Sequence, residues 1–153
     1  MTKVKIIDFQ DQYAKDFCSL NIEWLEAYFY VEDYDKKVLN NPKPYIIDKG
    51  GIILFAIAEN KVAGTLALIN RESEGIELSK MAVTKDFQGL RIGQKLIYAA
   101  IHRAGELGAH RLFLDSNTKL KPALNLYKKV GFTEIPMAST PYERGNIRME
   151  IKL

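Results

Sequence analysis

A glycine-containing turn between a strand-like and a helix-like segment is the part of this sequence whose residues point most clearly to chemistry. The turn reads Phe87-Gln88-Gly89-Leu90-Arg91-Ile92-Gly93-Gln94; it follows a strand-like run (76–84) and opens a helix-like run (92–107). The start of a helix leaves backbone N–H groups without partners and carries a partial positive charge, which suits a phosphate. Glycine permits the close approach of a ligand or a positive φ. The turn therefore predicts a phosphate site, although a plain structural turn would have a similar sequence.

Two familiar phosphate-binding motifs do not match this turn. A P-loop ends in Gly-Lys followed by Ser or Thr, whereas here Gly93 is followed by Gln94 and Lys95. A dinucleotide fingerprint has the spacing G-x-G-x-x-G, whereas this turn has Gln88-x-x-Arg91-x-Gly93. If the turn binds a phosphate, it belongs to neither the P-loop nor the dinucleotide-binding class.

Hydrophobic periodicity predicts the elements that position this turn. Strands are expected at 3–9, 52–58, 62–69, 76–84, 111–114, 132–135 and 146–153, and helices at 11–28, 32–40, 92–107 and 121–130. The short connection 59–61 predicts a hairpin between the second and third strands. This order predicts an α/β fold, with a mixed central sheet of about seven strands and helices on both faces. At 153 residues the chain is expected to form one domain, 1–153.

Composition excludes several classes of function. The chain is 47% hydrophobic and 27% charged, as in a globular protein, and its net charge of +3 is too small and too dispersed to indicate nucleic-acid binding. No apolar run reaches the roughly 18 residues of a membrane span, and no signal-peptide core is present, so a cytoplasmic location is expected. The single cysteine and the two separated histidines, His102 and His110, predict no metal site.

Two blocks of sequence, in this order of elements, resemble the GNAT superfamily of N-acetyltransferases. The family signature Gln/Arg-x-x-Gly-x-Gly/Ala is matched by Gln88 to Gly93, with Arg91 in place of the usual middle glycine. That departure is tolerable if the position stays helical, and the guanidinium could then contact a phosphate. The second block, Ala123-Leu124-Asn125-Leu126-Tyr127-Lys128-Lys129-Val130-Gly131-Phe132, is similar to the family segment A-x-x-L-Y-x-x-x-G-F. The resemblance covers essentially the whole chain.

The resemblance implies transfer of an acetyl group from acetyl-CoA, as co-substrate, to an amine. It also implies that the fourth and fifth strands splay apart and hold the pantetheine arm between them. The residues that it places on the pantetheine are Met81, Ala82 and Val83, and those on the pyrophosphate are Gln88, Gly89, Leu90, Arg91, Ile92, Gly93 and Gln94. Further contacts are implied for Asn117 with the pantetheine, Ala123 with the ligand and Lys128 with the 3′-phosphate. The step of six positions from Asn117 to Ala123 exceeds the usual family spacing.

Two residues are candidates for the proton transfers. An alkyl ammonium with a pKa near 10.4 must lose a proton before it can attack, and the departing thiolate must gain one. Tyr127 matches the family tyrosine that donates its phenolic proton to the thiolate; otherwise it is an ordinary half-buried tyrosine. Glu77 is the candidate base, acting through water, or else a glutamate on the solvated side of a strand. Strand parity places Glu77 on the face of Met81 and Val83, barring a bulge.

The acceptor site is expected between the first two helices and the loop before the last strand. The candidates for substrate binding are Trp24, Tyr28, Glu32 and Tyr142, with Arg144 opposite. Acidic and aromatic groups could hold a cationic amine; the alternative account of these residues is a helix cap and core packing. The sequence leaves open whether the acceptor is a polyamine, an amino acid, an aminoglycoside, a peptide N-terminus or a protein lysine. Two alternative functions also remain: a non-catalytic acyl-CoA sensor and an acyltransferase with another acyl donor. The family is compatible with a homodimer.

Overall fold

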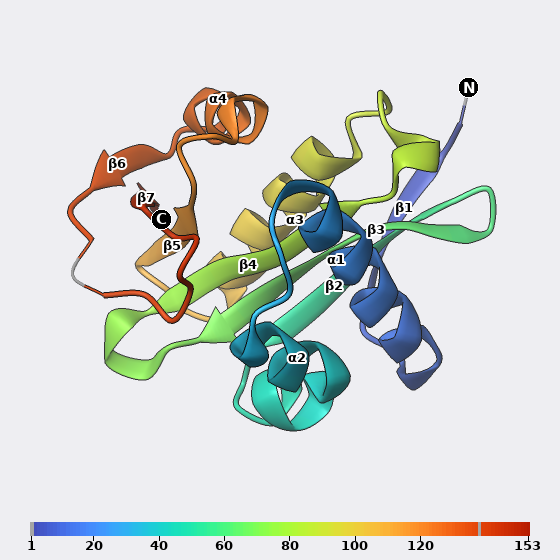
Figure 1. Cartoon of the computed structure of the whole chain (residues 1–153), viewed down its shortest axis with the longest axis horizontal. Helices are drawn as coiled ribbons and strands as arrows, with labels where there is room; N and C mark the ends of the chain where they lie inside the picture. The colour runs from blue at the N-terminus through green and yellow to red at the C-terminus, as the bar shows by residue number, and fades with distance from the viewer. Residues whose placement is uncertain (1, 138) are drawn as a thin grey trace.

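A seven-stranded mixed sheet forms the frame of the computed structural model, which describes residues 2–137 and 139–153 (Figure 1). The strands are β1 (Val4–Asp8), β2 (Ile52–Ala58), β3 (Lys61–Asn70), β4 (Ile76–Val83), β5 (Arg111–Ser116), β6 (Thr133–Ile135) and β7 (Ile147–Lys152). Their spatial order is β1-β2-β3-β4-β5-β7-β6, and every neighbouring pair is antiparallel except β4 and β5. The predicted fold class and the β2–β3 hairpin are confirmed.

Helices cover both faces of the sheet, as predicted. They are α1 (Ala14–Tyr28), α2 (Asp33–Asn40), α3 (Ile92–Glu106) and α4 (Lys121–Val130), with short helical turns at Asp11–Tyr13, Lys43–Ile47, Glu72–Glu74 and Lys85–Phe87. One hydrophobic core lies under α1 and α2, and a second lies under α3 and α4. Figure 1 shows α1 and α2 in front of the sheet and α3 behind it. No helix in the described part of the chain is long and apolar enough to cross a membrane.

The parallel strands β4 and β5 pair over a short length only. Their register contains two pairs, Ile76 with Leu112 and Glu77 with Phe113. Beyond Glu77 the two strands separate, as expected from the resemblance. The C-terminal half of β4 is therefore hydrogen-bonded to β3 on one side and open on the other, which leaves backbone groups for a ligand.

A β-bulge at Lys80 changes the facing of β4. The register with β3 shifts between Thr65 and Ala67, and Lys80 has a φ of +54°. Glu77 pairs with Ile69, which belongs to the core under α1 and α2. Met81 and Val83 pack against the other core, under α3 and α4. The expectation that Glu77 shares a face with Met81 and Val83 is therefore wrong, because the extra residue of the bulge switches the alternation.

Candidate active site

A groove of about 500 Å³ lies between the C-terminal half of β4, the turn before α3 and the start of α4. Its lining includes most of the residues that the resemblance assigns to the donor: Met81, Ala82, Val83, Gln88, Gly89, Arg91, Ile92, Gly93, Gln94 and Ala123. Leu90 instead packs against the core beneath the turn, and Lys128 lies exposed in the last turn of α4. We call this surface the donor groove.

The turn at the head of the donor groove has a left-handed backbone at two positions. Gly89 has a φ of +85°, and a Cβ built there would meet no atom within 4 Å. Arg91 caps α3 with φ +58° and ψ +30°. The condition under which arginine would be tolerable here, a helical backbone at position 91, is not met: the residue is left-handed, a conformation that glycine adopts most readily. The exposed Arg91 side chain borders the groove beside the free N–H groups of the α3 N-terminus.

A smaller cavity of about 120 Å³ adjoins the donor groove, and we call it the reaction cavity. Both are lined by Trp24, Met81 and Ala123, so the two spaces meet at these side chains. The reaction cavity lies where β4 and β5 have parted, and its lining also includes Ser79, Lys80, Asp115, Asn117, Tyr127, Tyr142 and Arg144.

Tyr127 borders the reaction cavity with a protonated phenol. Its ring packs against Phe132, with 5.9 Å between the ring centroids, and the side chain is buried. Burial raises the pKa of Tyr127 to about 12, so the hydroxyl keeps its proton at neutral pH. No hydrogen bond to this hydroxyl occurs among residues 2–137 and 139–153. The group is therefore available as a proton donor to a ligand, and it is a poor base at neutral pH.

Glu77 lines a different cavity, of about 230 Å³, together with Arg71, Glu74 and Arg148. Its carboxylate accepts a hydrogen bond from Nε of Arg71 at 2.7 Å, and its side chain is 2% exposed. Burial raises the pKa of Glu77, while the Arg71 guanidinium acts in the opposite direction. Asp115 borders both this cavity and the reaction cavity. Glu77 and Tyr127 thus do not line one common space.

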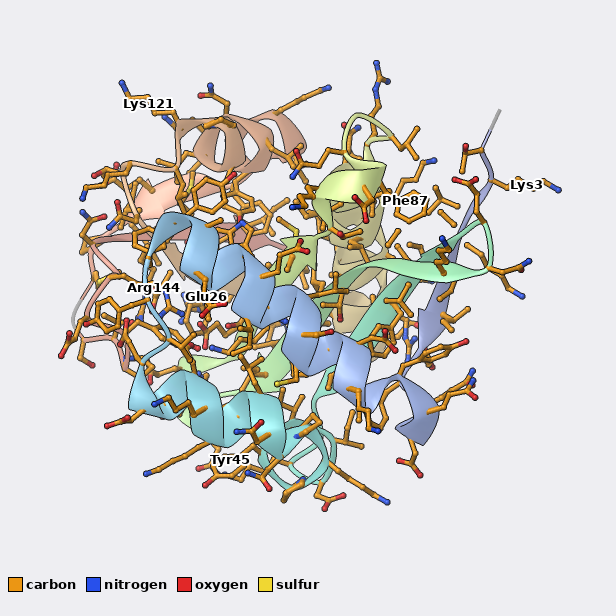
Figure 2. The ribbon with its side chains drawn as sticks, turned by 45° about the vertical axis from the view of Figure 1, so that its right-hand side comes forward. Lys3, Glu26, Tyr45, Phe87, Lys121 and Arg144 are labelled. Atoms are coloured by element: carbon orange, nitrogen blue, oxygen red, sulfur yellow. The ribbon has the colours of Figure 1, made fainter. Side chains whose placement is uncertain are left out.

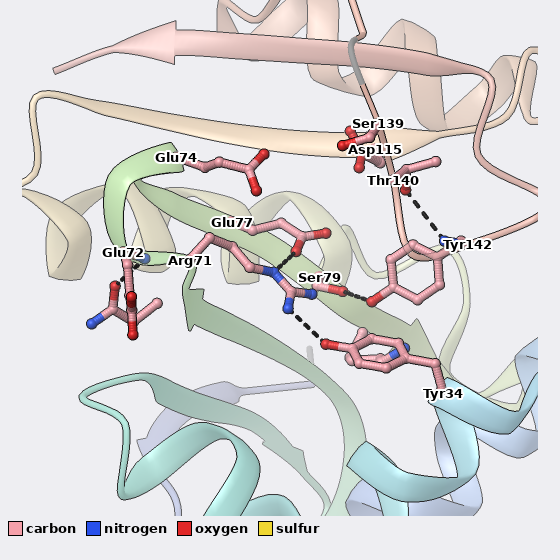
Figure 3. A network of polar contacts seen from close by, with 12 residues as sticks. Tyr34, Arg71, Glu72, Glu74, Glu77, Ser79, Asp115, Ser139, Thr140 and Tyr142 are labelled. Carbon is pink, nitrogen blue, oxygen red and sulfur yellow. Dashed lines mark hydrogen bonds and ion pairs between the residues drawn. The ribbon is translucent and has the colours of Figure 1, made fainter.

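A network of polar side chains separates these two cavities (Figure 3). Arg71 donates through Nη1 to the hydroxyl of Tyr34 at 2.6 Å, and Ser79 Oγ lies 3.3 Å from the hydroxyl of Tyr142. The remaining nitrogen of Arg71, Nη2, is buried and has no hydrogen-bond partner among the described residues. Figure 3 shows that this nitrogen points toward Ser79. A buried donor of this kind has an acceptor in most structures, through either protein, water or ligand.

Two of the four residues expected at the acceptor site line the reaction cavity, and two do not. Trp24 and Tyr142 border it. Tyr28 is 56% exposed and packs on the Trp24 ring, with 5.3 Å between centroids. Glu32 is buried behind the cavity, where it accepts hydrogen bonds from the Glu143 N–H and from Arg144, both at 2.9 Å. Figure 2 shows Arg144 beside the connection between α1 and α2.

A buried ionic cluster behind the reaction cavity escaped the sequence reasoning. Asp35 is fully buried and accepts hydrogen bonds from Lys80 Nζ at 2.6 Å and from Arg144 Nη1 and Nη2 at 2.8 and 2.9 Å. Burial raises the pKa of Asp35, but Arg144 and Lys80 outweigh it and lower the pKa to about 2. The available signal was Lys80 itself, a lysine inside an otherwise half-apolar strand.

Asn117, which the resemblance places on the pantetheine, shapes the loop that closes the reaction cavity. Its Nδ2 donates to the carbonyl of Arg144 at 2.7 Å, and its Oδ1 accepts from the Lys119 N–H at 2.8 Å. An amide carries two N–H donors, so one remains for a ligand.

Comparisons with known proteins agree with this geometry. The family model described as "Acetyltransferase (GNAT) family" matches residues 16–132. An uncharacterized N-acetyltransferase, YvbK of Bacillus subtilis, is 30% identical over 104 residues, which are 66% of this chain and 67% of that protein. Several other curated relatives are matched over only 45% to 56% of their length.

Solved structures share the fold over nearly the whole chain. An acetyltransferase of the GNAT family from Staphylococcus aureus Mu50 has a TM-score of 0.87 at 23% identity, covering 98% of this chain and 99% of that one. YncA from Salmonella typhimurium, solved with its cofactor acetyl-CoA, has a TM-score of 0.76 at 17% identity, covering 98% and 94%.

Proposed function

Because this chain belongs to the GNAT family of acetyltransferases, we propose that it transfers the acetyl group of acetyl-CoA to an amine. The observation that carries this proposal is the continuity of the donor groove with the reaction cavity through Trp24, Met81 and Ala123. A donor anchored by its phosphates at one end of the groove can place its thioester beside Tyr127 at the other. The acetyl-CoA bound by YncA, which has the same fold, supports this choice of donor.

The pyrophosphate of the donor binds at the turn from Gln88 to Gln94. There the N–H groups at the start of α3 supply hydrogen bonds and partial positive charge, and Arg91 adds a charge-assisted contact. The pantetheine arm follows the open edge of β4 from Met81 to Val83, where the strand has lost its β5 partner. Asn117 and Ala123 contact this arm, and Lys128 approaches the 3′-phosphate.

The transfer proceeds by direct attack. The neutral amine nitrogen forms a bond to the thioester carbonyl carbon, the carbon–sulfur bond breaks, and Tyr127 donates its proton to the departing thiolate. Glu77 receives the proton of the amine through water that links its cavity to the reaction cavity beside Asp115. The burial that raises the pKa of Glu77 makes its carboxylate a stronger base than an exposed glutamate. Solvent then restores both residues.

Release of the CoA thiol across a panel of amines tests this function. We expect release that depends on both acetyl-CoA and an amine, and that is faster with acetyl-CoA than with propionyl- or succinyl-CoA. A matched measurement of acetyl-CoA binding completes the test. Binding of acetyl-CoA without thiol release for any amine in the panel would contradict the proposed transfer.

A further inference from the structure

Of the buried ionic cluster, only the cations reach the lining of the reaction cavity. Lys80 and Arg144 both line the cavity, whereas their partners Asp35 and Glu32 do not. Among the residues that the structure describes, Asp115 is the one acid in the lining. Both of its carboxylate oxygens accept hydrogen bonds from Arg148, at 2.6 and 3.0 Å. The cations in this lining are therefore Lys80 and Arg144, whose side chains are 3% and 15% exposed and whose carboxylate partners lie outside the lining, while the acid in the lining is already paired.

Lys80 occupies the position in which an acceptor ammonium would have been expected. Its Nζ lies 2.6 Å from Asp35, 4.5 Å from the centroid of the Tyr142 ring and 5.7 Å from that of Tyr34. Such a combination of a carboxylate and aromatic faces binds cations. The bulge brings Lys80 onto this face of β4, so the chain fills the cation site with its own amino group, whose pKa is lowered by burial while Asp35 acts in the opposite direction. A second ammonium placed here would be repelled by the first.

Arg144 keeps hydrogen-bonding capacity for a ligand. Its guanidinium donates three hydrogen bonds, one to Glu32 and two to Asp35. A guanidinium carries five N–H groups, so two remain, and the side chain is still 15% exposed. The unpartnered Nη2 of Arg71 is a further donor near this region: it is directed toward Ser79, which lines the reaction cavity, although Arg71 itself lines the neighbouring cavity beside Glu77. This surplus of donors calls for a ligand with acceptor oxygens.

We propose that the acceptor is a small amine that also carries a carboxylate, as an amino acid does, and that Lys80 and Arg144 bind this carboxylate. The inference rests on the proposed function and specifies its acceptor. A volume of about 120 Å³ accommodates a carboxylate and a few carbon atoms, since a water molecule occupies about 30 Å³ in the liquid. Charge-assisted and bidentate hydrogen bonds make arginine an effective partner for a carboxylate.

Matched acceptors test the proposal with the unmodified protein. The values of kcat/KM are compared for β-alanine against propylamine, and for γ-aminobutyrate against butylamine. The dication 1,4-diaminobutane is tested as a third kind of acceptor. We expect each amino acid to exceed its alkylamine by roughly 10- to 100-fold, with the diamine lowest, because only the carboxylate satisfies the cavity donors. Equal values within each pair, or a preference for the diamine, would overturn the proposal.

Substitutions identify the residues responsible for the preference. Lys80→Met and Arg144→Gln should each reduce the ratio of amino acid to alkylamine about 5-fold or more, whereas Lys129→Met, which removes an exposed charge on α4, should leave the ratio unchanged. An undiminished ratio in folded Lys80→Met and Arg144→Gln proteins would contradict the assignment.

A competition experiment avoids any risk that these substitutions impair folding. Propionate should inhibit the unmodified enzyme competitively against the amine, and more strongly than propionamide does; the reverse order would overturn the proposal.

Absence of thiol release with every amine would instead remove the proposed function itself. Release without a carboxylate preference would remove only this inference. A preference for succinyl-CoA over acetyl-CoA would assign Lys80 and Arg144 to the acyl group and overturn their role with the acceptor.

Discussion

The donor groove differs in construction from the acceptor side of the reaction cavity, by which we mean the side formed by Lys80 and Arg144. The head of the donor groove is a single stretch of chain, from Gln88 to Gln94, in which Ile92 is buried and the other residues are exposed or partly exposed, and which we propose binds the donor through N–H groups. The acceptor side is an assembly of buried side chains, in which Asp35 of α2, Lys80 of β4 and Arg144 of the β6–β7 loop hold one another. The first region is defined by the backbone conformation of one turn, and the second by ion pairs among buried side chains.

This difference determines how each region should respond to substitution. A change in the exposed turn alters one local conformation and one ligand contact, so its effects should be small and separable. A change in the ionic cluster leaves a buried charge without its partner, which costs several kcal/mol in typical proteins. Between the two regions lies Tyr127, whose effect should appear in the rate alone.

Tyr127→Phe should produce the largest change. Loss of the phenolic proton donor should lower kcat by roughly 100- to 10,000-fold, while the KM for acetyl-CoA changes little because the ring remains. Steady-state kinetics by thiol release measure both parameters. Tyr98→Phe, which alters a half-exposed tyrosine on α3, serves as the control. An unchanged kcat in Tyr127→Phe would remove this residue from the mechanism.

Glu77→Gln should lower kcat by about 100-fold and alter its pH dependence. A base must be deprotonated, so the activity of the unmodified enzyme should rise with pH through the raised pKa of Glu77 and then level off. The variant should lose this acidic limb. Glu74→Gln, which changes a more exposed glutamate beside the same cavity, should retain it. Identical pH profiles for Glu77→Gln and the unmodified enzyme would reject the role of the base.

Asp35→Asn should destabilise the fold by about 3 kcal/mol, because Lys80 and Arg144 lose a buried counter-charge. The folded pKa of about 2 lies below the usual value near 3.9. The stabilisation from Asp35 is therefore complete above about pH 4 and declines as the pH falls toward 2. Urea unfolding between pH 2 and 7 should show this decline in the unmodified protein and not in the variant. Asp33→Asn, at a side chain that is 97% exposed, is the control; equal losses in both would contradict the prediction.

Arg91→Gly should have the smallest effect, with opposite signs for stability and binding. Glycine relieves the left-handed conformation at φ +58°, so the free energy of unfolding should rise by up to about 1 kcal/mol. Loss of the guanidinium should weaken acetyl-CoA binding about 3- to 5-fold and reduce its dependence on salt. Gly89→Ala, at φ +85°, should instead lower stability by about 1 kcal/mol. A destabilised Arg91→Gly protein would argue against this conformation of the turn.

The donor side could be predicted from the sequence because its information is local. Each strand and helix follows from a hydrophobic pattern within a few residues, and the pairing of a strand, a glycine turn and a helix lies in one segment from 76 to 107. The left-handed conformation of Arg91 does not follow from such a pattern, because an arginine carries no sign that the turn requires a positive φ before the helix begins.

The acceptor side could not be predicted because its contacts join distant parts of the chain. The bond from Lys80 to Asp35 spans 45 residues, and those from Arg144 to Asp35 span 109. No periodicity encodes such pairs, and the bulge that turns Lys80 toward them interrupts the alternation on which strand facing was judged. Because this ion pair could not be foreseen, Glu32 was expected to bind the acceptor, whereas its carboxylate is paired with Arg144.

Thermal unfolding with and without acetyl-CoA, with ATP and NAD as controls, tests the donor groove most directly. Acetyl-CoA at about 100 times its Kd should add about 2.7 kcal/mol to the free energy of unfolding. For a chain of this length, that corresponds to an increase in Tm of roughly 5–10 °C. We expect this increase with acetyl-CoA and a much smaller one with ATP or NAD. No increase at millimolar acetyl-CoA, or an equal increase with all three ligands, would contradict the donor site described above.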